Sequence, residues 1–150
     1  MKTLAVPFAA LLGVLAGCST QPSIDYGKYG LAEVSGTVTL DDQPLAGALV
    51  IFESEDNRTS SGRTDGDGRY VLMLNPSKSG ILPGKKTVRI STALSESEEE
   101  TALGVETIPK RYNTDSELTA DVKPEETQTF HFDLTSEGEV EQPEFDMPEA

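Results

Sequence analysis

The chain offers few side chains suited to covalent or acid–base chemistry, and they stand far apart. It contains one cysteine, Cys18, and one histidine, His131. A single cysteine excludes an intramolecular disulfide, and nucleophilic catalysis needs a nucleophile, a base and an orienting group together. His131 lies in an alternating segment, opposite Phe130 and Phe132 and on the same face as Asp133, which is typical of a polar strand residue. We therefore expect no enzymatic activity.

The cysteine stands at the end of a segment with the features of a bacterial export leader. Lys2 is the one charged residue before it, and the uncharged stretch 4–16 is too short to span a bilayer. The stretch runs into Leu-Ala-Gly-Cys at 15–18, which is similar to the lipobox of bacterial lipoproteins. This resemblance implies cleavage between Gly17 and Cys18 and a diacylglycerol on the Cys18 sulfur. We predict a signal peptide over 1–17; an ordinary signal peptide or a buried core cysteine is the alternative.

The residues after the cysteine predict a lipidated tether over 18–32. The segment is polar and interrupted by glycine and proline, and residues 19–31 would reach roughly 45 Å if fully extended. Two or three acyl chains anchor a protein stably where one binds marginally, at ~0.8 kcal/mol per buried CH₂. Ser19 suits sorting to the outer membrane. We expect an extracytoplasmic protein of the cell envelope, attached to the outer membrane by its lipid.

The chain is strongly acidic, with a formal net charge of −14 at pH 7 and a pI of about 4.3. Nucleic acid and anionic lipid surfaces both require basic patches, so this charge argues against them as partners. It favours solubility and repulsion between copies. Attraction of divalent cations or of a basic partner is the alternative.

Short alternating segments separated by turn residues predict a β-sandwich. Val34, Gly36, Val38 and Leu40 alternate with polar residues, and clusters of Asp, Gly and Pro mark the turns that follow. The length allows one domain plus appendages. We predict an all-β, seven-stranded antiparallel sandwich over 33–135, with strands at 33–40, 47–54, 60–64, 69–75, 85–92, 116–123 and 127–135.

The second predicted strand carries apolar residues on both faces, which indicates a covered sheet or an interface. Its Leu49 and Ile51 point away from the side shared by its other apolar residues. Alternation in the fourth predicted strand likewise points Val71 and Met73 outward. We predict that these four side chains form an interaction patch on the outer face of one sheet. Cover by a loop or by the acidic tail is the alternative.

Two acidic segments carry no strand pattern. In 95–106, Ser95 and Glu98 have capping-box spacing and Gly104 suits a helix end, so a short helix competes with an acidic crossover. The tail 136–150 has six acids, two prolines and no base. Such a composition cannot bury enough apolar surface to order itself, so we predict a disordered tail.

The loop Asp65-Gly66-Asp67-Gly68 is the candidate calcium site. It lacks the later ligand positions and the bidentate glutamate of a helix–loop–helix site. A β-turn, in which Asp accepts backbone N–H bonds and Gly supplies positive φ, explains the same residues. We favour the turn, keep Asp65 and Asp67 as calcium candidates only, and expect no cofactor. One histidine and an acylated cysteine do not make a zinc site.

The runs at 36–41, 44–52 and 64–70 resemble, in order and spacing, the carboxypeptidase regulatory-like domain. Further runs at 83–90 and 108–113 are similar to small bacterial lipoproteins built from one such domain. The resemblance covers 33–135 and implies a seven-stranded, transthyretin-like (prealbumin-type) Greek-key sandwich with a non-catalytic role. It carries over no functional residues.

The first hairpin departs from that family because Asp42 stands where a glycine is usual. Asp tolerates positive φ better than most residues, so we expect the tight turn to be kept. A longer loop is the alternative.

Taken together, these observations predict a membrane-anchored, non-catalytic lipoprotein that serves as a structural or protein-interaction module. The expected partners are the membrane, through the lipid, and a protein of the cell envelope. The alternative is an extracytoplasmic protein that binds calcium or a glycan through loops at one end of the sandwich. A hydrolase dependent on His131 is the third hypothesis.

Overall fold

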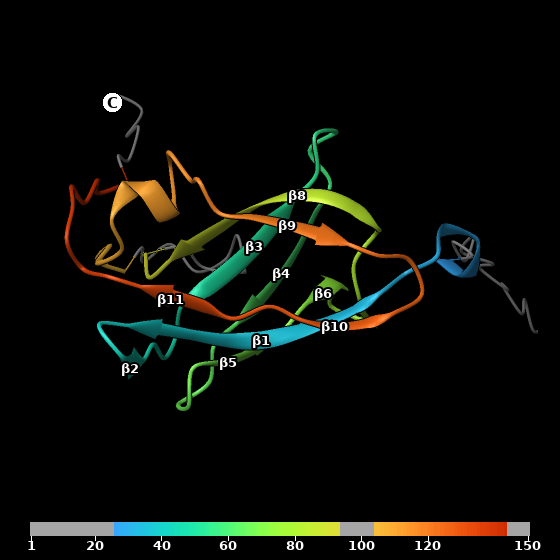
Figure 1. Cartoon of the computed structure of the whole chain (residues 1–150), viewed down its shortest axis with the longest axis horizontal. Coiled ribbons are helices and arrows are strands. Elements are labelled where there is room, and N and C mark those ends of the chain that lie inside the picture. The colour runs from blue at the N-terminus through green and yellow to red at the C-terminus, as the bar shows by residue number, and fades with distance from the viewer. Residues whose placement is uncertain (1–25, 94–103, 144–150) are drawn as a thin grey trace, which may run out of the picture.

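Two β-sheets pack face to face in the structure, a computed structural model that describes residues 26–93 and 104–143 (Figure 1). The described helical residues form two short 3₁₀ turns, η1 (Tyr26–Tyr29) and η2 (Lys110–Tyr112). In these two ranges no helix has the length and apolar character needed to cross a membrane. The chain is therefore an all-β sandwich over the part described.

The first sheet is built around β1 (Glu33–Leu40). On one side β1 pairs in parallel with β10 (Thr127–Thr129) and β11 (Phe132–Leu134). On its other side it pairs antiparallel with β2 (Gln43–Pro44) and β5 (Arg69–Val71). The prediction of a wholly antiparallel sandwich is wrong for the two parallel pairs. The last segment enters from the same end as β1 and runs in the same direction.

The second sheet contains six strands in the order β7-β6-β4-β3-β8-β9, and every recorded pair is antiparallel. Its two central strands are β4 and β3, and β3 aligns over its whole length with both β4 and β8. The six strands are β3 (Leu49–Glu53), β4 (Thr59–Arg63), β6 (Met73–Asn75), β7 (Lys78–Ser79), β8 (Gly84–Ser91) and β9 (Thr119–Val122).

The structure divides the described chain into eleven strands where the sequence predicts seven. Two of the additional strands, β2 and β7, have two residues each. The others arise because two predicted strands break. The segment 69–75 breaks at Leu72. Before Leu72 the chain forms β5, which pairs with β1 of the first sheet, and after it the chain forms β6, which pairs with β4 of the second. The segment 127–135 breaks at Phe130 and His131, between β10 and β11.

The core lies between the sheets and is formed by the alternate residues that the sequence pattern points inward. Four aromatic rings meet at its centre. The Phe52 ring lies 5.8 Å from that of Phe130 and 6.1 Å from that of Phe132, and both contacts are edge-on. Tyr70 stacks on Phe132 at 6.4 Å. The other fully buried large residues include Leu72, Ile81, Ile90, Ile108, Val34, Val38, Val50, Val88 and Val122.

Gly36 of β1 leaves room for the Phe130 carbonyl and the Tyr70 side chain to meet in this core. A Cβ at this position would lie 1.7 Å from the carbonyl oxygen of Phe130 and 2.9 Å from the Tyr70 ring. The same carbonyl accepts a hydrogen bond of 2.7 Å from the Tyr70 hydroxyl. Burial raises the pKa of Tyr70, so this hydroxyl stays protonated as a donor.

The first hairpin keeps its tight turn without glycine. Asp41 and Asp42 both have positive φ, 50° and 64°, and Leu40 pairs directly with Gln43 across them. These angles belong to the type I′ turn that suits two-residue hairpins. The expectation that Asp42 replaces glycine in this turn is confirmed.

The described part of the tail lies against η2. The backbone N–H of Lys110 donates to the carbonyl of Glu139 at 2.8 Å, and the two side chains form an ion pair at 2.7 Å. Thr114 also donates to the Glu141 carboxylate at 2.9 Å. The expected disorder therefore does not hold for residues 136–143, because fixed partners on the domain compensate for the low apolar content. Residues 144–150 lie outside the described residues.

The predicted short helix falls almost wholly outside the described residues, which stop at 93 and resume at 104. Residues 104–106 are not helical.

Candidate functional site

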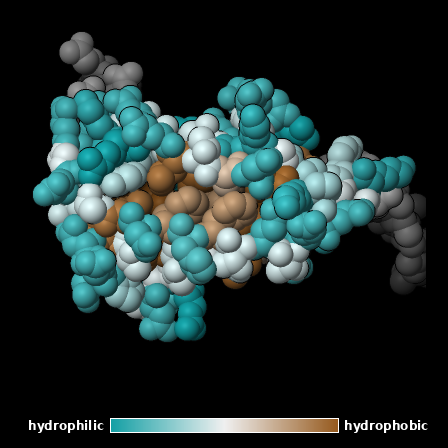
Figure 2. All heavy atoms as spheres, viewed as in Figure 1, coloured by the Kyte–Doolittle hydropathy of each residue, from teal (hydrophilic) through white to brown (hydrophobic). Residues whose placement is uncertain are grey.

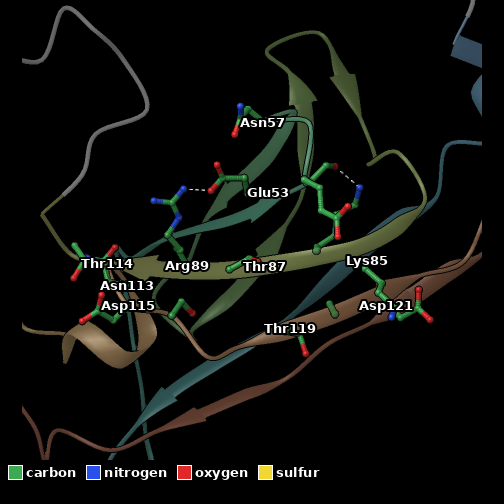
Figure 3. Close-up of a pocket in the computed structure, with 15 residues that line it drawn as sticks. Glu53, Asn57, Lys85, Thr87, Arg89, Asn113, Thr114, Asp115, Thr119 and Asp121 are labelled. Atoms are coloured by element: carbon green, nitrogen blue, oxygen red, sulfur yellow. Dashed lines mark hydrogen bonds and ion pairs between the residues drawn. The ribbon is translucent and has the colours of Figure 1, made fainter.

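A polar groove crosses the outer face of the second sheet, over β3, β8 and β9 (Figure 3). Its volume is about 780 Å³. The hairpin after β3 borders it on one side and the loop after η2 on the other. The lining residues are Glu53, Ser54, Glu55, Asn57, Lys85, Lys86, Thr87, Arg89, Asn113, Thr114, Asp115, Ser116, Thr119, Ala120 and Asp121.

The floor of the groove follows from the period of two in β8. Val88 and Ile90 are buried in the core, so Lys85, Thr87 and Arg89 point to the outer face. Their neighbours across the sheet are also polar, since the register places Asp121 opposite Lys85. A strand with one apolar and one charged face thus makes both the core and the groove.

Glu53 and Arg89 form an ion pair across the groove (Figure 3). Glu53 lies opposite Thr87, so Arg89 is its diagonal neighbour on the same face. Their side chains are 22% and 38% exposed, so water screens the pair and its effect on stability is small. The pair fixes two charges of opposite sign at the centre of the surface.

Lys86 closes the groove at the end near β3, although its side chain belongs to the inner face. The residue is only 4% exposed. Its Nζ donates to the Ser54 hydroxyl at 2.5 Å and to the Pro83 carbonyl at 3.3 Å. Burial lowers the pKa of Lys86, while the nearby Asp56 carboxylate acts in the opposite direction.

Glu106 is a buried carboxylate behind the other end of the groove. It is 3% exposed, and its Oε1 accepts from the backbone N–H groups of Thr92, Thr107 and Ile108 at 2.9–3.1 Å. Its Oε2 accepts from the Ser91 hydroxyl and from the Asn113 amide, at 2.5 and 3.0 Å. A carboxylate surrounded by donors needs no cation, so Glu106 joins the end of β8 to the segment that leads into η2.

The residues that line the groove carry polar groups suited to hydrogen bonding. Neither histidine nor cysteine is among its lining residues, and the Ser116 hydroxyl donates to the carbonyl of Val88. No aromatic ring lines it either, so it lacks the usual stacking surface for a sugar. The lining offers hydrogen bonds and charges of both signs.

The four residues of the predicted patch do not form one surface. Leu49 is buried, at 5% exposure, and Ile51 and Met73 are half-buried on either side of Ser61. Val71 is exposed, at 57%, but it belongs to β5 of the other sheet. The prediction assumed one continuous strand over 69–75, and the crossing between sheets separates its two halves.

The calcium candidates form a turn. Asp65 Oδ1 accepts the backbone N–H groups of Asp67 and Arg69, both at 2.9 Å, and these bonds lower the pKa of Asp65. Gly68 follows with a φ of 74°. Across residues 26–93 and 104–143, no cluster of three His, Cys, Asp or Glu side chains is placed to hold a metal ion.

His131 lies in the break between β10 and β11, beside the first sheet, and is not among the residues that line the groove. Its Nδ1 lies 2.8 Å from the Thr37 hydroxyl, and Thr39 donates to Asp133 at 2.8 Å. These two cross-strand pairs place the histidine beside a threonine rather than beside the aspartate. Cys18 and Gly17, the predicted lipidation and cleavage residues, lie outside the described residues.

Sequence reasoning missed the groove, Lys86 and Glu106. Lys85, Thr87 and Arg89 carry a period-two signal that indicates an outer face, but no local signal shows which strands lie beside them. Glu106 is the last residue of an acidic segment whose composition predicts exposure to solvent. Its burial depends on partners up to 36 residues away in the chain.

The sequence matches no protein-family model and no curated protein. Among solved structures, the chain is similar to a DUF3823 family protein from Parabacteroides merdae ATCC 43184, with a TM-score of 0.41 and 12% sequence identity. The aligned region covers 69% of this chain and 45% of that one. A likeness at this level carries no argument about ligand, partner or activity.

Proposed function

We propose that the protein is a lipid-anchored, non-catalytic module of the bacterial cell envelope that acts by holding a protein partner. The observation that carries the proposal is the sequence Leu-Ala-Gly-Cys at 15–18, which ends an uncharged stretch and precedes a folded domain. The groove supports it because its residues suit polar contacts. At the finer level, we propose the transthyretin-like Greek-key topology and membership of the carboxypeptidase regulatory-like family.

The beginning of the domain limits how far it would stand from the membrane. The carbonyl of Gly30 accepts from Glu125 N–H at 3.1 Å, and Ala32 forms a bridge with Ile81. Only the residues between Cys18 and η1 then remain as a spacer, with a reach of at most roughly 30 Å. The end of the sandwich that carries η1 and the β9–β10 turn would face the lipid surface.

The anchor is tested by substituting Cys18→Ala in the bacterial host. The expected result is an unprocessed precursor that incorporates no labelled fatty acid, whereas the parent chain is shortened and labelled. The matched control is Ser19→Ala, which keeps the thiol and is expected to be processed. Normal size and normal membrane partition of the Cys18→Ala variant would refute the anchor.

A second candidate function is binding of calcium or a glycan. The polar groove of about 780 Å³ favours a polar ligand, although it lacks aromatic side chains for a sugar ring. Calorimetry with calcium and with a panel of polysaccharides checks it. Absence of heat at millimolar ligand removes this candidate and leaves the protein-binding role.

A further inference from the structure

One side of the sandwich is open between the edge strands of its two sheets. In Figure 1, β9 runs above β10 and β11, and Figure 2 shows from the same viewpoint that apolar side chains line the hollow between them. β9 pairs with β8 alone among the described strands, and β10 and β11 pair with β1 alone. Leu118 and Phe130 pack on the core from this side but are only partly buried.

The backbone of β9 directs unused hydrogen-bonding groups to this open side. Val88 N–H donates to the carbonyl of Leu118 at 2.9 Å, and the register continues residue by residue along β8 and β9. In an antiparallel ladder, alternate residues exchange these bonds with the neighbouring strand. The N–H and C=O groups of Thr119 and Asp121 therefore face away from β8.

The opposite edge has the same property. The N–H of Phe130 donates to the carbonyl of Ser35 in β1 at 3.0 Å, and the C=O of Leu134 accepts from Asp41, the residue after β1, at 2.9 Å. Because backbone direction alternates along a strand, Asp133, between Phe132 and Leu134 of β11, directs its N–H and C=O groups toward the open side. Two strand edges thus flank one apolar hollow.

Side-chain bridges close both ends of the hollow. At one end, the Gln128 amide accepts from Lys123 N–H at 3.1 Å and donates to its carbonyl at 2.9 Å. At the other end, Arg111 donates to the Thr135 hydroxyl at 2.6 Å. Residues 129–134 lie between these bridges, which corresponds to a strand of roughly 20 Å.

We propose that an extended segment of a protein partner adds as a strand along this open side. Packed sheets lie ~10 Å apart, twice the ~4.8 Å between paired strands, so one added strand fits between the two edges. Alternate apolar side chains of the segment enter the hollow over Leu118 and Phe130. The inference rests on the proposed role as an interaction module and specifies how the partner is held.

The charged residues of this chain beside the hollow indicate which residues the ends of the partner segment should carry. Between Glu117 and Leu134 the chain carries five Asp or Glu residues and one lysine, Lys123, and all six are exposed. These acidic residues repel a second acidic copy of this chain and attract lysine or arginine side chains of a partner. The occupant is therefore a strand with alternating apolar residues and basic ends, supplied by another protein.

The test is a titration of the isotope-labelled full chain, purified in detergent, with the peptide Lys-Thr-Val-Thr-Val-Thr-Val-Lys. The expected result is saturable change in the amide NMR signals of Thr119, Asp121 and Asp133. A peptide of equal composition without alternation, and one with glutamate ends, should each bind about tenfold more weakly or not at all. Methylation of the peptide nitrogens on one edge should abolish binding without altering the protein.

A pair of variants tests the edge from the protein side. Asp121→Pro removes the outward N–H and should weaken binding about tenfold, whereas Asp121→Asn keeps that N–H and should bind within about threefold of the parent chain. No signal change at millimolar peptide, equal binding of the non-alternating peptide, or a dimer that protects these amides without peptide would overturn the proposal. None of these results bears on the Cys18 anchor, which fatty-acid labelling tests separately.

Discussion

The side chain of Gln142 holds the backbone of Glu106 through two hydrogen bonds, accepting from its N–H at 3.0 Å and donating to its C=O at 2.9 Å. The amide thus pairs with the backbone as a neighbouring strand would. This contact joins the acidic tail to the segment whose own carboxylate is buried against β8. The tail is therefore part of the domain over residues 136–143.

The first prediction concerns this contact. Gln142→Ala should lower the free energy of unfolding by about 1–2 kcal/mol, because it leaves the backbone groups of Glu106 without partners. Denaturant unfolding followed by circular dichroism measures the change. Val140→Ala, at an exposed position in the same segment, is the control and should change stability by less than about 0.5 kcal/mol. Equal stability of both variants would show that the contact of Gln142 with Glu106 contributes nothing.

The second prediction concerns the buried carboxylate. Glu106→Gln keeps the shape of the side chain but turns an amide toward the donors that now surround the two oxygens. Stability should fall by about 3 kcal/mol, since buried donors lose a charged acceptor. Thermal unfolding checks this. Glu117→Gln removes the same charge at an exposed site and should be nearly neutral.

The third prediction concerns the packing at Gly36. Gly36→Ala should destabilise the domain by about 2–3 kcal/mol, because the new methyl group meets the Phe130 carbonyl and the Tyr70 ring. Gly66→Ala is the matched control, since a Cβ there has no neighbour within 4 Å. If the two variants unfold at the same denaturant concentration, the close approach at Gly36 is wrong.

The fourth prediction concerns acid sensitivity at the Asp65 turn. Its two backbone hydrogen bonds lower the pKa of Asp65 in the folded state below that of the unfolded chain. The contribution of the carboxylate is therefore complete above the unfolded pKa and is lost as the pH falls through the folded pKa.

Asp65→Asn should accordingly be less stable than the parent at pH 7, and the gap should narrow as the pH falls below the unfolded pKa. Urea unfolding between pH 7 and pH 3 measures this difference. Asp67→Asn removes a charge from the same turn without removing those bonds and serves as the control. A constant gap between parent and Asp65→Asn across the range would contradict the assignment.

Local patterns in the sequence predict the strands well. Alternation over 33–40 predicts β1 with the same bounds that the structure has, and the paired aspartates predict the tight turn that follows it. Each of these features depends on residues that are neighbours in the chain. Period and turn chemistry are therefore sufficient to define them.

The patch and the tail depend on distant residues, and there the sequence reasoning fails. Leu72 has the pattern of any inward residue of a strand, yet the chain changes sheets at this point. Val71 pairs with β1 of the first sheet, and Met73 pairs with β4 of the second. Gln142 looks like one more polar residue of an acidic tail. No local pattern shows that a backbone 36 residues earlier is its partner.

The parallel pairing of β1 with β11 also constrains the order of events in synthesis. Thr39 and Asp133, bonded across these strands, are 94 residues apart. The first sheet is therefore incomplete until nearly the whole chain has left the ribosome, and contacts of such high sequence separation form slowly. A chain that completes its first sheet last stays unfolded during synthesis, which would suit the export proposed above.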